Sequence, residues 1–141
     1  VYYSGHDSRN EYVYKYVSDA AWDPADANRP GEEYDRLAIG NKYLDNGTLY
    51  VARFHADGSG EWLPLTPSAQ TRDGRTLAAA LGLADDDAAG IIINTCDAAD
   101  LLGATPMDRP EWASVDPASG EVYLTLTNNT QRTAEETTNL H

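Results

Sequence analysis

Charged side chains gather beside prolines in the stretch "ATPMDRPEW", which covers residues 104–112. Asp108, Arg109 and Glu111 lie within four residues, and two prolines restrict the backbone around them. A guanidinium is a rigid fork of donors that matches phosphate or carboxylate oxygens, and carboxylates are oxygen ligands for hard cations such as calcium. Arg109 and Glu111 point the same way in an extended segment, so the stretch is a candidate site for a metal and its bound anion. The alternative is a local ion pair that braces a loop.

Two further polar groups are candidates for the same kind of site. His6 and Asp7 follow an apolar strand and open a turn, and ligands are often presented from such loops. The alternative there is a turn in which the Asp7 side chain hydrogen-bonds its own backbone. Asn128, Asn129 and Thr130 follow another expected strand. An Asn side chain can donate to phosphate or ligate calcium through its carbonyl oxygen, and turn chemistry is again the alternative.

Other polar residues are interpreted as structural. The run Asp85–Asp87 is expected at a helix start, where the helix dipole favours acidic side chains. Cys96 lies in an expected helix with no histidine or second cysteine near it in sequence, so it is interpreted as a small packing residue. His55 follows a strand and is interpreted as a surface residue.

The charge balance narrows the classes of partner. The 141 residues include 10 Lys and Arg against 23 Asp and Glu, a formal net charge of −13. Nucleic acid binding is not expected, because neutralising phosphates needs clustered basic side chains. No apolar run approaches the roughly 18 residues of a membrane span, and one cysteine allows no intrachain disulfide. Because the chain begins without a methionine, we expect a piece of a larger protein.

Short antiparallel strands are expected to position these residues. Residues 1–19 alternate tyrosine with valine and lysine, which predicts a hairpin with its turn at Gly5–Asn10. A second hairpin is predicted from strands at residues 48–54 and 61–65, joined by a Gly-rich turn. A further strand is predicted at residues 122–126, where Val and Leu alternate with Tyr and Thr.

Helices are expected only in the middle of the chain. Alanine-rich and leucine-rich patterns predict a short helix near residues 76–81 and one longer helix near residues 86–102. Residues 20–43 predict a long surface connection, and the charged stretch is expected to be a loop after the longer helix. The fold class is therefore mainly β: antiparallel hairpins that form part of a β-propeller, with a short helical insertion at about residues 76–102.

Three motifs resemble the PhoX-type secreted alkaline phosphatases. In chain order they are "YSGHD…EYVYKYVS", "LDNGTLYVARFHADGSGEWLPL" and "GATPMDRPEW…GEVYLTLTNN", and together they span nearly the whole chain. The resemblance implies a six-bladed β-propeller that hydrolyses phosphate monoesters with an iron–calcium cluster in the periplasm or outside the cell. Residues 1–141 would then be a single, incomplete fragment of that phosphatase domain, with two to three blades.

The same resemblance implies roles for particular residues. Arg109 matches the catalytic arginine that binds the substrate phosphate, and Glu111 matches a glutamate that ligates the metal cluster. Asp7 keeps an acidic metal ligand, whereas His6 stands where the family often has a second aspartate. Asp108 and Asn128 are further candidates at the same site. The family's metal-binding cysteine belongs to a segment outside this chain, so its role is not transferred to Cys96.

Two other functions stay open at this stage. One is a calcium-stabilised β-propeller that binds a partner without catalysis, because a fold does not determine a function. The other is a propeller hydrolase of another ester class, such as a lactonase, for which a guanidinium fork has less use. If the parent protein is a phosphatase, this fragment alone is expected to be inactive, because most ligands of the metal cluster lie outside it. The oligomeric state is left open.

Overall fold

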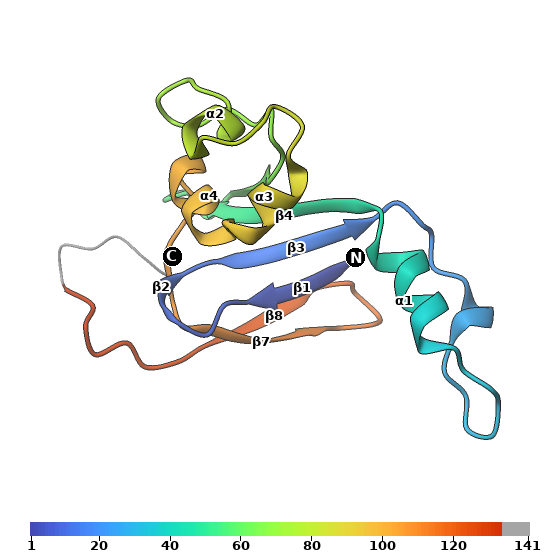
Figure 1. Cartoon of the computed structure of the whole chain (residues 1–141). Helices are drawn as coiled ribbons and strands as arrows, with labels where there is room; N and C mark the ends of the chain where they lie inside the picture. Colours follow the sequence, from blue (N-terminus) through green and yellow to red (C-terminus); the bar gives the residue numbers. More distant parts are fainter. Residues whose placement is uncertain (134–141) are drawn as a thin grey trace.

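A four-stranded antiparallel sheet forms the centre of the computed structural model, which describes residues 1–133. Its strands are β1 (Tyr2–Gly5), β3 (Val13–Ser18), β4 (Gly47–Phe54) and β5 (Gly60–Pro64), and they pair in chain order. Each strand therefore lies beside the one that follows it in the sheet (Figure 1). Both predicted hairpins are confirmed, since β1 pairs with β3 and β4 pairs with β5.

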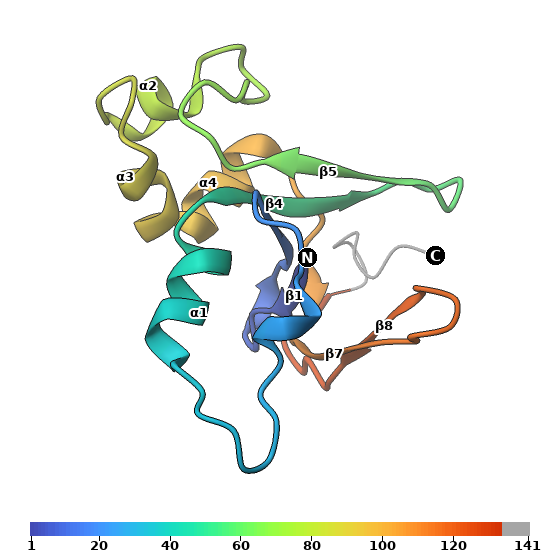
Figure 2. The same cartoon turned by 90° about the vertical axis from the view of Figure 1, so that its right-hand side faces the viewer.

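The main core lies between this sheet and three short helices. These helices are α2 (Leu77–Leu81), α3 (Ala88–Ile93) and α4 (Thr95–Leu102), and they gather on one side of the sheet (Figures 1 and 2). The core is built from apolar side chains of the sheet and the helices together with the segments that join them: Tyr12, Tyr14, Val51, Leu65, Leu77, Ile91, Ala98, Ala99, Leu102 and Ala104. Burial of these side chains stabilises the helices, which are too short to persist alone.

Two further strand pairs lie beside the central sheet. The strand β2 (Arg9–Glu11) pairs with β6 (Met107–Asp108), and β7 (Pro110–Val115) forms a hairpin with β8 (Val122–Leu126). A second, smaller apolar cluster of Val13, Ala52 and Met107 packs with side chains that include Leu124 of β8. The β7–β8 hairpin lies next to β1 in Figure 1, so residues 110–126 return to the beginning of the chain.

The predicted surface connection at residues 20–43 is wrong in part. It contains a short 3-10 turn, η1 (Pro24–Asp26), and the helix α1 (Arg36–Leu44). The Asp35 side chain caps α1 by accepting from the backbone N–H groups of residues 37 and 38. Only Tyr43 of this helix is buried, so α1 has no apolar stripe that periodicity could detect.

The single long helix predicted at residues 86–102 is also wrong. Asn94 leaves helical geometry, and its backbone N–H and its side chain both donate to the Gly90 carbonyl. The segment is therefore two helices, α3 and α4, although the buried face that includes Ile91, Ala98 and Leu102 follows the predicted spacing. The predicted helix start is confirmed at Asp87, whose side chain accepts from the backbone N–H of Gly90 at 2.7 Å.

The charged stretch is not the loop that the sequence predicts. The stretch forms β6 and β7, and Arg109 lies between these two strands in a conformation that is not extended. The prediction of a mainly β fold is confirmed, and so is the predicted strand at residues 122–126. The described residues form one four-stranded sheet and two strand pairs and do not close into a ring, so the propeller stays a prediction. Within residues 1–133, no helix has the length and apolarity that crossing a bilayer requires.

Candidate functional site

A close approach between two chain segments brings the candidate residues together. The last residue of β1, Gly5, lies against Pro110, the first residue of β7. A Cβ atom built on Gly5 would lie 2.7 Å from the Pro110 Cβ atom and nearer still to its carbonyl group, while the Pro110 side chain is itself fully buried. Only glycine allows this contact. It places residues 6 and 7, which follow β1, beside residues 109–111.

Arg109 has a backbone conformation that its residue type rarely adopts. Its φ angle is +44°, in the left-handed region, at the junction between β6 and β7. Such a conformation costs on the order of 1–3 kcal/mol and persists where the surrounding structure enforces it, often at functional sites. The turn re-aims the side chain, so that Arg109 Nη2 lies 2.9 Å from Asp7 Oδ1 and 3.7 Å from Glu111 Oε1.

Glu111 is held in place by Thr127, the residue that follows β8. Its Oε1 atom accepts a hydrogen bond from the Thr127 hydroxyl at 2.5 Å, and the Glu111 side chain is 21% exposed. The backbone N–H of Thr127 donates to the carbonyl groups of Asp108 and Arg109 at 3.1 and 3.3 Å. Thr127, directly after β8, therefore fixes both the Glu111 carboxylate and the backbone turn at Arg109.

Asp108 takes part in a different set of contacts from Glu111. Its Oδ1 atom pairs with the Arg132 guanidinium at 2.5 Å and accepts from Asn129 Nδ2 at 2.9 Å. The Asn129 amide also donates to Asn10, the other non-glycine residue with positive φ among the described residues. Asp108 is adjacent to the strained turn at Arg109 and is linked through the Asn129 side chain to the strained turn at Asn10. Asn128 is exposed, and the side chain that reaches this network is that of its neighbour, Asn129.

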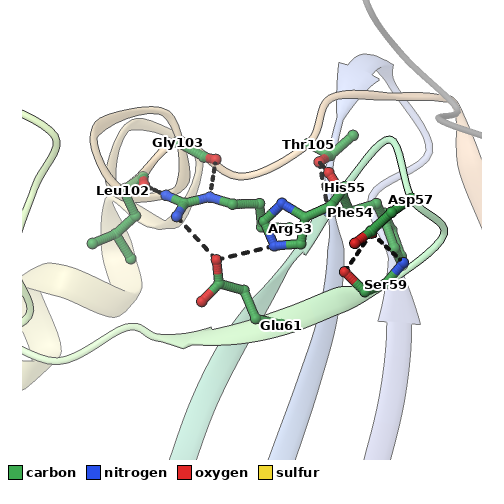
Figure 3. A network of polar contacts seen from close by, with 9 residues as sticks. All are labelled: Arg53, Phe54, His55, Asp57, Ser59, Glu61, Leu102, Gly103 and Thr105. Atoms are coloured by element: carbon green, nitrogen blue, oxygen red, sulfur yellow. Dashed lines mark hydrogen bonds and ion pairs between the residues drawn. The ribbon is translucent and has the colours of Figure 1, made fainter.

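The start of the charged stretch is anchored to the central sheet through the network in Figure 3. Arg53 of β4 donates from Nε to the Gly103 carbonyl at 2.8 Å and from Nη2 to the Leu102 carbonyl. These carbonyl groups end α4 and would otherwise lack helical partners. Two residues further on, Thr105 Oγ1 accepts from the backbone N–H of Phe54 at 2.8 Å. Residues 102–105 are thereby fixed to β4, ahead of Arg109.

The site combines one guanidinium with two carboxylates. The Arg109 side chain is 36% exposed and the Asp7 side chain 50% exposed, so both can be reached from solvent. The trio of Asp7, Arg109 and Glu111 carries one net negative charge when all three groups are ionised. The carboxylates can hold a hard cation, and the N–H groups of Arg109 that face away from them can hold an oxyanion.

The structure joins residues that the sequence keeps far apart. Asp7 meets Arg109 across a separation of 102 positions, and Cys96 lies beside His6 and Glu11. No histidine is near Cys96 in the sequence, but the fold brings His6 Nδ1 to 3.4 Å from its sulfur, because β1 ends next to the first turn of α4. The packing role of Cys96 stays a prediction. The aromatic side chain of the motif, Trp112, is 75% exposed on β7 and does not contribute to a core.

The chain is similar to known proteins over nearly its whole length. A family model described as alkaline phosphatase PhoX matches residues 1–140. Among solved structures, Pseudomonas fluorescens PhoX in complex with vanadate, a transition state analogue, is similar at 39% identity and a TM-score of 0.67. That alignment covers 94% of this chain and 21% of the Pseudomonas chain, so this chain spans about a fifth of that protein's length. No curated protein matches. The chain belongs to the PhoX alkaline phosphatase family.

Proposed function

We propose that the chain is part of a metal-dependent phosphomonoester hydrolase in which Arg109 binds the substrate phosphate. Glu111 and Asp7 are its proposed metal ligands. The observation that carries the proposal is the convergence of these three side chains, with Arg109 Nη2 at 2.9 Å from Asp7 Oδ1 and 3.7 Å from Glu111 Oε1. A strained backbone at Arg109 enforces that convergence, which a solvated ion pair would not need.

The donor set fits the metals that the family resemblance implies, calcium and iron. Asp7 and Glu111 supply carboxylate oxygens, the ligands that hard cations prefer. Such a metal supplies Lewis acidity toward a phosphoryl oxygen when bound. These two carboxylates are too few for a complete coordination shell, and the further ligands are proposed to come from segments outside this chain.

The residues of this chain have distinct parts in the proposed reaction. Arg109 binds two oxygens of the phosphoryl group in a bidentate manner, orients it, and neutralises the charge that develops as the ester bond breaks. When the guanidinium turns to the substrate, Asp7 and Glu111 lose their ion pair and become available to a cation. Asp108 acts as a positioning residue, because its pair with Arg132 braces the backbone at Arg109.

Three further proposals rest on family membership. Residues 1–141 are a piece of a β-propeller domain with two to three blades; the four-stranded meander β1-β3-β4-β5 has the strand order of a blade. The protein acts in the periplasm or outside the cell. Asn128 is retained as a weaker candidate for the site, since its backbone adjoins Asn129, whose side chain contacts Asp108.

The test compares variants of the full-length protein to which this chain is proposed to belong. Arg109→Ala is expected to lower kcat/KM for a chromogenic phosphomonoester by about 10²- to 10³-fold, with metal content unchanged. Glu111→Gln is expected to lower both activity and bound metal. Arg75→Ala is the matched control, because Arg75 is an exposed arginine that pairs with Asp73 in a turn before α2.

Three results would argue against the phosphatase. Unchanged turnover in Arg109→Ala would remove the proposed role of the guanidinium. Bound calcium without any turnover in the unmodified protein, with or without chelator treatment, would instead support a calcium-stabilised binding module. Hydrolysis of lactones in preference to phosphomonoesters would move the assignment to another class of ester.

A further inference from the structure

Three different metal-ligating side chains meet beside the candidate site. His6 follows β1, Glu11 ends β2, and Cys96 lies in the first turn of α4. His6 Nδ1 lies 3.1 Å from Glu11 Oε2 and 3.4 Å from Cys96 Sγ, and all three potential ligand atoms lie within 4.8 Å of one another. The cluster is separate from the proposed phosphate site, because Asp7 contacts Arg109 while His6 contacts Glu11 and Cys96.

These distances match the size of a tetrahedral zinc site. With Zn–N and Zn–O bonds of about 2.0–2.2 Å and a Zn–S bond of about 2.3 Å, neighbouring ligand atoms lie roughly 3.3–3.6 Å apart. The two contacts of His6 are close to that range. One nitrogen, one sulfur and one oxygen ligand suit a borderline cation such as zinc better than calcium, which takes oxygen ligands.

Buried polar atoms lie at the cluster. Within residues 1–133, Glu11 Oε2 and the Tyr14 hydroxyl are buried, and Glu11 Oε2 has His6 Nδ1 as its ion-pair partner at 3.1 Å. A buried carboxylate is stabilised by a charged partner, and a cation held by the three side chains would provide one.

We propose that His6, Glu11 and Cys96 bind one zinc ion, or a divalent cation of similar preference, at a site distinct from the phosphatase centre. The half-exposed His6 leaves the fourth ligand position open to water. The ion links the loop after β1 to α4, two segments that the chain separates by 90 positions. Because Asp7 follows His6 directly, the ion also restrains the loop that carries this carboxylate.

Cobalt substitution tests the site directly on the untagged 141-residue chain. A cobalt(II) titration is expected to produce a thiolate-to-metal charge-transfer absorption that saturates at one equivalent and disappears when zinc is added. The chain has one cysteine, so the absorption reports on Cys96 alone. Cys96→Ser is expected to abolish the absorption, and His6→Gln and Glu11→Gln are each expected to weaken cobalt binding at least about tenfold.

His55→Gln is the matched control, since His55 is a half-exposed histidine on the β4–β5 hairpin whose acidic neighbour is Glu61. It is expected to leave the cobalt absorption unchanged. Circular dichroism confirms that each variant is folded, and alkylation of Cys96 gives a second measurement that zinc, but not calcium, should slow. Absence of the charge-transfer absorption in the wild type, or zinc binding that survives Cys96→Ser undiminished, would overturn the site.

Discussion

Replacing Gly5 with alanine should disrupt the contact on which the candidate site depends. The new Cβ atom would lie 2.7 Å from Pro110 Cβ, whereas ordinary contact between such atoms begins near 3.4 Å. One of the two segments must therefore move by roughly 0.7 Å or more, and the fully buried Pro110 leaves little room for that movement. Overpacking of this kind typically costs about 1–3 kcal/mol of unfolding free energy.

Urea denaturation of the chain measures this loss against a control in the same molecule. A Cβ atom on Gly40, in the middle of α1, would meet no atom within 4 Å. Gly40→Ala should therefore stabilise the chain by up to about 1 kcal/mol through helix propensity. In the full-length protein, Gly5→Ala should also lower kcat/KM, because Asp7 moves away from Arg109. Equal unfolding free energies for the two variants would refute the packing argument.

Two further substitutions test the contacts that hold the helices. Tyr12→Phe should lower the unfolding free energy by about 1–3 kcal/mol, because it removes a hydrogen bond from a buried hydroxyl to the Asp100 carboxylate of α4. Thermal denaturation measures this loss, and an unchanged melting temperature would contradict it. Hydrogen bonds from Lys42 and then Tyr43 lower the pKa of Asp26 below its ordinary 3.8. The stabilisation from Asp26 is therefore present above about pH 4 and is lost as the pH falls through the lowered value. An NMR titration of the Asp26 carboxyl in the wild type should show the lowered pKa, and a titration at the ordinary pKa would show that these contacts are absent in solution. Asp26→Asn should reduce the acid sensitivity of α1, which the backbone NMR signals of this helix can follow.

Local patterns predict several strands and the ends of two helices in this chain. Alternating apolar and polar residues indicate β3, β4 and β8, and Gly82 and Gly103 follow α2 and α4 in left-handed geometry, as helix-ending glycines do. The apolar pattern does not predict α1, because Tyr43 is the only buried side chain of this helix. Its clearest sequence signal is the capping residue Asp35. The break between α3 and α4 arises from a side-chain cap at Asn94, which apolar spacing does not report.

The candidate site is predictable only in part, for a physical reason. Residue types single out Arg109 and Glu111, but the expected extended segment, in which alternate residues share a face, is interrupted by the left-handed turn at Arg109. The partnership with Asp7, and the meeting of His6 with Cys96, depend on the return of β7 to β1 and of α4 to the end of β1. Contacts between segments about 90 to 100 positions apart follow from tertiary packing, which no local pattern encodes.

The most direct measurement is a crystal structure of the full-length protein with its metals and vanadate bound. We expect the Arg109 guanidinium to donate to the oxyanion, and the carboxylates of Glu111 and Asp7 to have left Arg109 for a metal ion. An oxyanion bound away from Arg109, with the Arg109 contacts to Asp7 and Glu111 retained at 2.9 and 3.7 Å, would contradict the proposed site.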